Sequence, residues 1–122
     1  LGLSAECPMW LNEGIAQYFE ASYQKDAVYA RLKESREARI PLKKMPSRLG
    51  KIDDVELARW VYLQGLGFVE FLAEKYNPFR LRLLLRAIAE EHSVATAFER
   101  VYGRSTEDLE KEWWKRIENP DG

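Results

Sequence analysis

The chain has 122 residues, with 19 Lys and Arg against 20 Asp and Glu, and a formal net charge of −1. This length fits a single domain, residues 1–122, and the 46% apolar content excludes a disordered chain. The charge argues against electrostatic binding of nucleic acid, and no apolar run is long enough to span a membrane. One cysteine, Cys7, and one histidine, His92, exclude an internal disulfide and a Cys/His zinc site built by this chain alone.

The first predicted helix begins at Pro8 and extends to about Tyr23. Gly14 lies in the middle of it, where glycine costs about 1 kcal/mol relative to alanine. Close approach of another backbone or of a ligand would explain this choice. The apolar stripe of the helix has a spacing of four residues and consists of Leu11, Ile15, Phe19 and Tyr23.

The next two segments are predicted to be more exposed. A second helix, about residues 26–39, is rich in charges, so it should touch the core by a narrow face. Residues 40–52 contain two prolines, one glycine and several basic residues, which indicates a surface loop. The narrow face of the second helix is predicted to consist of Ala27, Ala30 and Leu32.

The third predicted helix, about residues 55–76, is apolar almost all round, which is typical of a buried central helix. Asp53 or Asp54 is placed to cap its start. Asn77 is predicted to cap a fourth helix, which extends to about Glu91. The inward residues of this fourth helix are predicted to be Leu81, Leu84, Leu85 and Ile88.

Two further helices follow. Ser93 can cap a short fifth helix that ends before Gly103, a residue that suits a left-handed stop. Ser105 begins a capping box for a sixth helix, and residues 118–122 are predicted to be a linker. We therefore predict a mainly α fold, with about six helices packed around the central one. The sixth helix should bury Leu109, Trp113 and Ile117.

Glu13 is the residue of the first helix that suggests chemistry. It lies off the apolar stripe, on the side of Trp10 and Gln17. A carboxylate between a tryptophan and the space left by Gly14 fits a metal or substrate site. Glu20 is two turns away, too far for a tight carboxylate pair. The alternative from spacing alone is that Glu13 is an ordinary solvated glutamate.

Three segments of the chain resemble one known family. Residues 10–19, WLNEGIAQYF, resemble the W-L-N-E-G-x-A-x-Y-F segment of gluzincin metallopeptidases, in particular the peptidase MA-like domains of bacterial proteins. Residues 62–72, YLQGLGFVEFL, are similar to the family's later Y-x-Q-S-x-x-F-V-x-F-L helix, with Gly65 in place of the serine. Residues 97–113, AFERVYGRSTEDLEKEW, are similar to its C-terminal pattern. The three segments occur in the family's order and extend over most of the chain.

The resemblance implies roles for four residues. Glu13 corresponds to the third zinc ligand, and Tyr62 to a group that stabilises the developing oxyanion. Asn12 and Gln17 lie beside the ligand and would support the metal's other ligands. The family usually has an acid at the position of Gln17, and a glutamine is a weaker hydrogen-bond acceptor. The alternative for Tyr62 is a core tyrosine whose hydroxyl lies at the rim.

The family's other zinc ligands belong to an H-E-x-x-H helix that precedes the glutamate ligand, and this sequence has no such motif. His92 is expected to be a surface or helix-capping histidine. We expect either that the chain begins just after that helix or that this protein has lost it. Zinc and a peptide or protein substrate are expected for the complete parent domain, whereas this chain alone is expected to bind no catalytic zinc and to be inactive.

A missing upstream helix would have two structural consequences, and one alternative function is possible for the chain. If an upstream helix is missing, Met9, Trp10 and Trp60 should form an exposed apolar patch, and the first helix should promote self-association. The alternative function is a helical protein–protein interaction module, such as a degenerate, non-catalytic peptidase relative. Such a module would bind through the Trp10 face or through the basic residues Lys43, Lys44 and Arg48.

Overall fold

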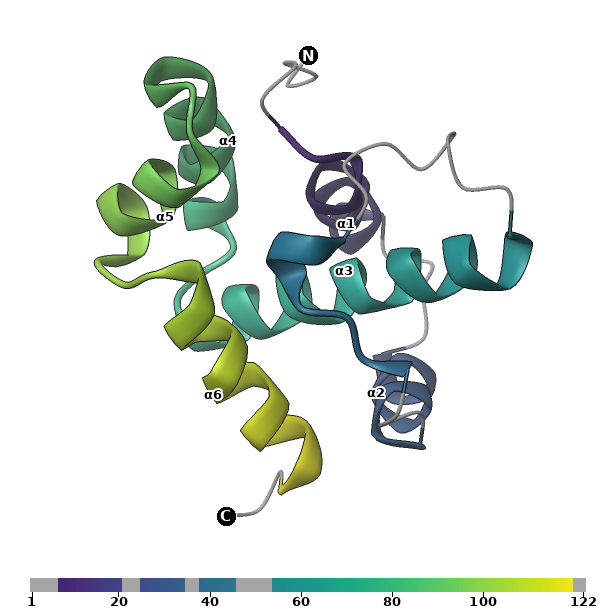
Figure 1. Cartoon of the computed structure of the whole chain (residues 1–122). Helices are drawn as coiled ribbons and strands as arrows, with labels where there is room; N and C mark the ends of the chain where they lie inside the picture. Colours follow the sequence, from purple (N-terminus) through teal and green to yellow (C-terminus); the bar gives the residue numbers. More distant parts are fainter. Residues whose placement is uncertain (1–6, 21–24, 35–37, 46–53, 120–122) are drawn as a thin grey trace.

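The computed structural model describes residues 7–20, 25–34, 38–45 and 54–119 (Figure 1). These residues form six α-helices and one short 3-10 helix, without a strand, so the predicted mainly α fold is confirmed. Within the described ranges, no helix combines the length and the apolar character needed to cross a membrane. The helices are α1 (Met9–Phe19), α2 (Lys25–Glu34), α3 (Val55–Lys75), α4 (Phe79–Glu91), α5 (Val94–Tyr102) and α6 (Thr106–Glu118), and the 3-10 helix is η2 (Leu42–Lys44).

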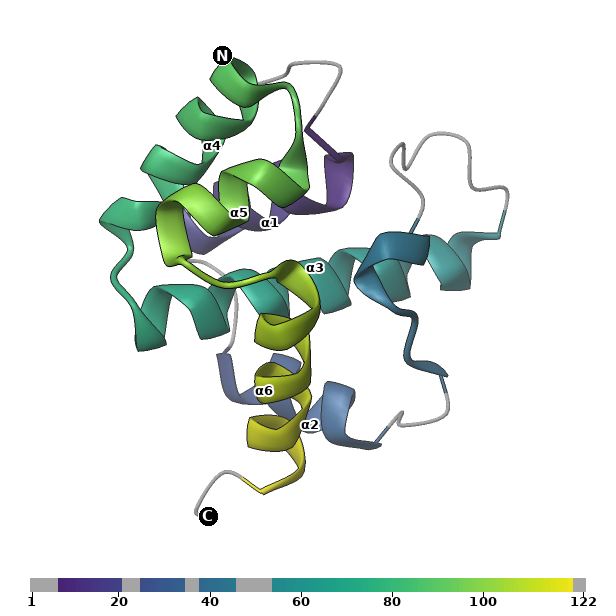
Figure 2. The ribbon, with the colours of Figure 1, turned by 60° about the vertical axis from the view of Figure 1, so that its left-hand side comes forward.

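The long helix α3 occupies the centre of the molecule. Both views place α1, α4 and α5 on one side of α3, and α2 with the end of α6 on the other (Figures 1 and 2). Phe68 of α3 is fully buried, and its ring centroid lies 6.3 Å from that of Trp10, 6.1 Å from that of Phe98 and 5.3 Å from that of Trp113. One side chain of α3 therefore packs against α1, α5 and α6.

The predicted helix caps are confirmed. Four side chains each accept a hydrogen bond from a backbone N–H in the first turn of their helix, at 2.8–3.3 Å. Gly103 ends α5 with φ +70°, in the left-handed region that glycine tolerates. Asp53, the alternative cap of α3, lies outside the described residues. The four capping residues are Asp54, Asn77, Ser93 and Ser105.

Two helices are shorter than predicted. Helix α1 ends at Phe19, whose side chain is 44% exposed, so the apolar stripe stops after Ile15. Tyr23 lies outside the described residues. Helix α2 ends at Glu34.

The inward face of α2 also differs from the prediction. Val28 and Leu32 are buried, whereas Ala27 and Ala30 are exposed. Positions 28 and 32 are one turn apart, and they carry the larger apolar side chains, which gain more from burial than alanine does.

The other sequence expectations for buried helix faces agree with the structure, with one exception on α3. Leu57 is partly exposed near the start of α3. On α4, Leu85 is half-buried and packs against the core. The fully buried members of the predicted sets are Leu81, Leu84, Ile88, Leu109 and Ile117, and Trp113 is almost fully buried.

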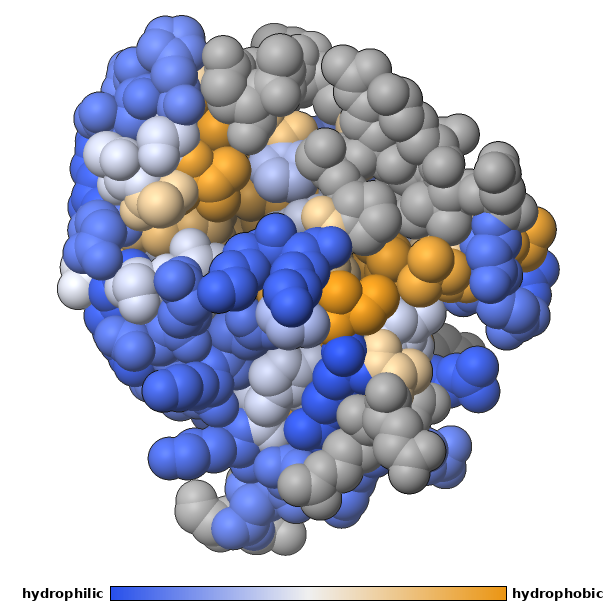
Figure 3. Space-filling view, viewed as in Figure 1, coloured by the Kyte–Doolittle hydropathy of each residue, from blue (hydrophilic) through white to orange (hydrophobic). Residues whose placement is uncertain are grey.

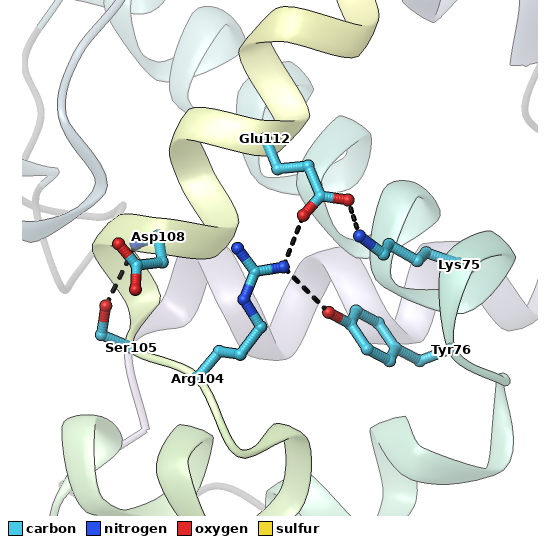
Figure 4. Close-up of polar contacts among 6 residues, drawn as sticks. All are labelled: Lys75, Tyr76, Arg104, Ser105, Asp108 and Glu112. Carbon is cyan, nitrogen blue, oxygen red and sulfur yellow. Dashed lines mark hydrogen bonds and ion pairs between the residues drawn. The ribbon is translucent and has the colours of Figure 1, made fainter.

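An ionic cluster links the end of α3 to α6. Glu112 of α6 forms ion pairs with Lys75 of α3 and with Arg104, which precedes α6 (Figure 4). Arg104 also donates to the hydroxyl of Tyr76 at 3.2 Å, while Ser105 caps α6 beside it. Because these groups are partly exposed, each ion pair stabilises the fold only modestly, but together they hold the α5–α6 turn against α3.

The two chain segments expected to lie outside the core differ from the prediction in part. In the predicted loop 40–52, Leu42 and Met45 are buried, while Lys43 and Lys44 are exposed; residues 46–52 lie outside the described ranges. Glu118 is the last residue of α6 rather than the first of a linker, and residues 120–122 are not described.

The prediction of an exposed apolar patch formed by Met9, Trp10 and Trp60 is wrong for Trp10. Trp10 is only 4% exposed, because its ring packs on Phe68 in the core. Trp60 is 9% exposed, and Met9 is half-buried. Trp10 and Trp60 therefore do not form the expected exposed patch, and self-association stays a prediction that no observation tests.

Candidate functional site

Glu13 and Tyr62 meet at the contact between α1 and α3. Both side chains are half-buried, and they lie close enough for the Glu13 carboxylate to act on the Tyr62 hydroxyl. The pKa of Tyr62 is raised, first by burial and then by the neighbouring Glu13 carboxylate. The two residues to which the family resemblance assigned chemistry are thus neighbours that interact.

A pair of glycines lets the two helices approach closely enough for this contact. A Cβ atom on Gly14 would lie 3.0 Å from the backbone oxygen of Gly65, and a Cβ on Gly65 would lie 2.7 Å from the backbone oxygen of Trp10. The helices therefore touch backbone to backbone. This confirms that Gly14 marks a close approach of another backbone.

The same geometry explains why Gly65 departs from the family's serine. Any side chain at this position would begin with a Cβ inside the contact distance of the Trp10 carbonyl. Because that oxygen belongs to the backbone of α1, it moves only if the whole helix moves. In this protein, a serine at position 65 would increase the separation of α1 and α3 beside Glu13 and Tyr62.

Asn12 and Gln17 flank Glu13 on α1, and both are half-buried. Within the described part of the chain, no hydrogen bond joins either side chain to Glu13 or Tyr62. The structure therefore brings Glu13 and Tyr62 together and leaves the supporting roles of Asn12 and Gln17 as predictions.

The donor atoms near Glu13 do not by themselves amount to a metal site. Among the described residues, no three His, Cys, Asp or Glu side chains lie close enough together to hold a metal ion. His92 is exposed at the end of α4 with φ 56°, as expected for a surface or capping histidine. Cys7 is buried, and burial raises the pKa of its thiol to about 11, so the thiol stays protonated at neutral pH. Glu13 can supply one carboxylate to a metal that other groups complete.

Gln64 is a further functional candidate. The sequence indicated it only as one residue of the family's Y-x-Q-S motif, without a role of its own. Its fully buried amide accepts from the backbone N–H of Ile40 at 3.1 Å and donates to the backbone carbonyl of the same residue. It also lies 3.3 Å from the sulfur of Met45. Gln64 thereby attaches residues 40–45 to α3, two positions after Tyr62. A polar residue within the apolar run of residues 60–69 of α3 is the signal that could have revealed it.

Glu110 of α6 holds the same segment from the other side. Its carboxylate accepts from the backbone N–H of Leu42 at 3.0 Å and from the indole N–H of Trp114 at 3.4 Å. Burial raises the pKa of Glu110, and the two hydrogen bonds lower it by less. Gln64 and Glu110 together fix residues 40–45 between α3 and α6, with Lys43 and Lys44 exposed.

The surface beside this segment carries apolar groups. Figure 3 shows apolar atoms at the middle of the face and again over the first turns of α3, among hydrophilic residues. Val55 is 62% exposed there. On the side of α3 that faces α2, a cavity of about 530 Å³ adjoins these turns.

Comparison with known proteins gives one match. A family model described as the peptidase MA superfamily matches residues 2–119. This confirms the resemblance to peptidase MA-like domains that the three motifs indicated. Neither a curated protein nor a solved structure matches the chain.

Proposed function

Because the chain belongs to the peptidase MA superfamily, we propose that it forms the helical C-terminal part of a zinc-dependent metallopeptidase domain acting on peptides or proteins. In this proposal Glu13 is one of three protein ligands of the zinc, and Tyr62 stabilises the oxyanion. The observation that carries the proposal is that Glu13 and Tyr62 lie close enough across the α1–α3 contact for the carboxylate to raise the pKa of the hydroxyl. Two residues far apart in the sequence, each with a role implied by the family, converge at one point.

The position of Glu13 suits a metal ligand. Its carboxylate is half-buried, so it is partly shielded from water yet reachable from outside the helix pair. The neighbouring Tyr62 hydroxyl can donate a hydrogen bond to it, which leaves lone pairs of the carboxylate for a cation. When bound, zinc would polarise the scissile carbonyl and lower the pKa of a water molecule.

Tyr62 suits the role of a hydrogen-bond donor to developing negative charge. Burial and the charge of Glu13 raise the pKa of its hydroxyl, so it keeps its proton at neutral pH. A neutral phenol held beside the ligand can donate to an oxyanion without gaining or losing a proton. The hydroxyl would donate a hydrogen bond to the substrate oxygen.

The remaining zinc ligands must come from elsewhere. A zinc hydrolase needs two further protein ligands and a base, and His92, the single histidine of the sequence, is exposed at the end of α4. We therefore place the two histidines and the base on an H-E-x-x-H helix outside these 122 residues. The 122-residue chain alone is expected to be inactive.

The test uses the complete natural protein that contains this chain. Glu13→Gln keeps the size of the side chain and removes its charge, so bound zinc and peptidase activity should both fall by at least tenfold. Glu20→Gln, an exposed position at the end of α1, is the matched control and should keep both. Full zinc and full activity in Glu13→Gln would overturn the ligand role, and absence of H-E-x-x-H upstream would favour the second candidate.

That second candidate is a helical interaction module without catalytic activity. The observation that favours it is the attachment of residues 40–45 by Gln64 and Glu110, which presents Lys43 and Lys44 on a firmly held segment. Arg48 lies outside the described residues, and the buried Trp10 cannot serve as a contact surface. A partner bound in this way should be lost when Lys43 and Lys44 are both changed to glutamine.

A further inference from the structure

The cavity between α2 and the first half of α3 has a different chemistry from the rest of the molecule. Its volume is about 530 Å³, within the range of small-ligand sites. Arg31 of α2 and Arg59 of α3 line it, and Glu56 is the one acidic residue among its described lining residues. The described lining residues therefore carry a net charge of +1, from two arginines and one glutamate, although the whole chain has a net charge of −1.

The two arginines of this cavity are available to a ligand. Both Arg31 and Arg59 are exposed, and neither forms a salt bridge with another described residue. Elsewhere in the described chain, arginines such as Arg39 and Arg104 are paired with glutamates. A guanidinium offers a planar set of N–H donors that matches a carboxylate, and two of them on facing helices can bind one carboxylate from both sides.

The wall of the cavity between the arginines is apolar. Val28 and Trp60 are buried, and Leu63 is half-buried, and all three line the cavity. A ligand that fits must therefore carry an anionic group next to an apolar one. The last residue of a peptide, with its free carboxylate and an apolar side chain on the same Cα, has both within a single residue.

We propose that this cavity binds the C-terminal carboxylate of a peptide that ends in an apolar residue. Arg31 and Arg59 hold the carboxylate, and the last side chain packs on Val28, Trp60 and Leu63. Arg59 precedes Tyr62 by three positions, so the two lie on adjacent turns of α3. The inference deepens the proposed function, on which it rests for the cleavage of the bound peptide, because it makes peptides with a free C-terminus the substrate class.

Binding is tested on the 122-residue chain with N-acetyl-Gly-Gly-Leu as the probe. Titration is followed by ¹⁵N NMR of the indole N–H of Trp60, whose signal is assigned by its loss in Trp60→Phe. The free acid should shift this signal in a saturable way, and the C-terminal amide should bind at least tenfold more weakly, because a charged hydrogen-bond acceptor is lost. Equal affinity for acid and amide would overturn the proposal.

Single substitutions test whether the probe binds in this cavity, and circular dichroism tests whether each variant is folded. Arg31→Gln and Arg59→Gln should each weaken binding of the acid by roughly tenfold, whereas Glu56→Gln should strengthen it because a repelling charge is removed. Arg86→Gln, an exposed arginine on α4, should leave it unchanged. If Arg31→Gln and Arg59→Gln remain folded by circular dichroism and bind the acid as the unchanged protein does, the site is not in this cavity.

Two further probes distinguish a C-terminal carboxylate from other anions. One variant distinguishes this peptide site from the proposed zinc site. N-acetyl-Gly-Glu-Gly amide, which has only a side-chain carboxylate, and inorganic phosphate should both bind much more weakly than the free acid. Equal binding of either would overturn a C-terminal site. Glu13→Gln should keep the affinity for the free acid, because the probe needs no metal. Loss of zinc with intact peptide binding in Glu13→Gln is therefore the result expected when both proposals hold. Retention of zinc would overturn the ligand role alone, and failure of the unchanged protein to prefer the free acid over the amide would overturn this inference alone.

Discussion

The backbone carbonyl of Trp10 on α1 lies so near Gly65 on α3 that a Cβ atom at position 65 would be 2.7 Å from its oxygen. The matching position on α1 is Gly14, where a Cβ would lie 3.0 Å from the backbone oxygen of Gly65. This glycine contact sets the separation of the two helices. It thereby decides how close the Glu13 carboxylate and the Tyr62 hydroxyl lie to each other.

Gly65→Ser should destabilise the protein although serine is small. The new Cβ meets backbone atoms that cannot rotate away, so α1 must shift, at a cost of about 1–3 kcal/mol in the free energy of unfolding. Chemical denaturation measures this cost. Ala16→Ser, on the exposed side of α1, is the control and should change stability by less than about 0.5 kcal/mol. Equal stability of Gly65→Ser and the unchanged protein would show that the helices are not in backbone contact.

Glu13→Gln should lower the pKa of Tyr62. The variant removes the negative charge that disfavours the phenolate, but burial, the larger cause, stays, so the pKa should fall only part of the way to its usual value near 10. A pH titration of the Tyr62 ring-carbon NMR signal measures it. Glu20→Gln serves as the control. No change in the titration of Tyr62 would mean that the two side chains do not interact in solution.

The raised pKa of Tyr62 also predicts how stability depends on pH. The folded state binds the phenolic proton more tightly than the unfolded state, whose pKa is near 10. The contribution is therefore fully present below pH 10 and is lost as the pH rises through the folded pKa. Burial raises the pKa of Tyr102 in the same direction. The free energy of unfolding should decrease above about pH 10, and Tyr62→Phe should show a smaller decrease than the unchanged protein.

Gln64→Leu should release residues 40–45 from α3. Leucine has nearly the same volume but leaves both backbone polar groups of Ile40 without their partner, which costs about 1–3 kcal/mol. Hydrogen exchange of the Ile40 amide should accelerate strongly, while amides in the middle of α3 change little. Gln17→Leu is the matched control, since no described residue hydrogen-bonds to that side chain. Unchanged protection at Ile40 would contradict the attachment.

Glu110 provides a test that depends on pH. Burial raises the pKa of its carboxyl, so ionised Glu110 costs stability at neutral pH, and this cost disappears as the pH falls below the folded pKa. Glu110→Gln keeps an acceptor for the Leu42 N–H without the buried charge, so it should be as stable as the unchanged protein or more stable at pH 7. Glu110→Ala leaves that N–H unpaired and should lose about 1–3 kcal/mol. Denaturation curves of both variants at pH 7 and pH 4 measure these differences.

The features that could be predicted from the sequence depend on interactions between residues close together in the chain. The caps Asp54, Asn77, Ser93 and Ser105 each bond to a backbone N–H two or three positions later, so neighbouring residues were enough to identify them. The apolar spacing that buries Leu109, Trp113 and Ile117 likewise repeats within a single helix. The family motif identified Glu13 and Tyr62 as candidates, although it could not show that they touch.

The contacts between helices were decided by the tertiary structure. The glycine contact of Gly14 and Gly65 allows α1 to lie against α3 and buries Trp10, which the sequence led us to place on the surface. The bonds of Gln64 to Ile40 and of Glu110 to Leu42 join residues that no periodic pattern relates. The physical reason is the separation in sequence of the residues that interact. A cap or an amphipathic stripe is formed by neighbouring residues of one helix, whereas a hydrogen bond between elements forms only after packing has brought their backbones together.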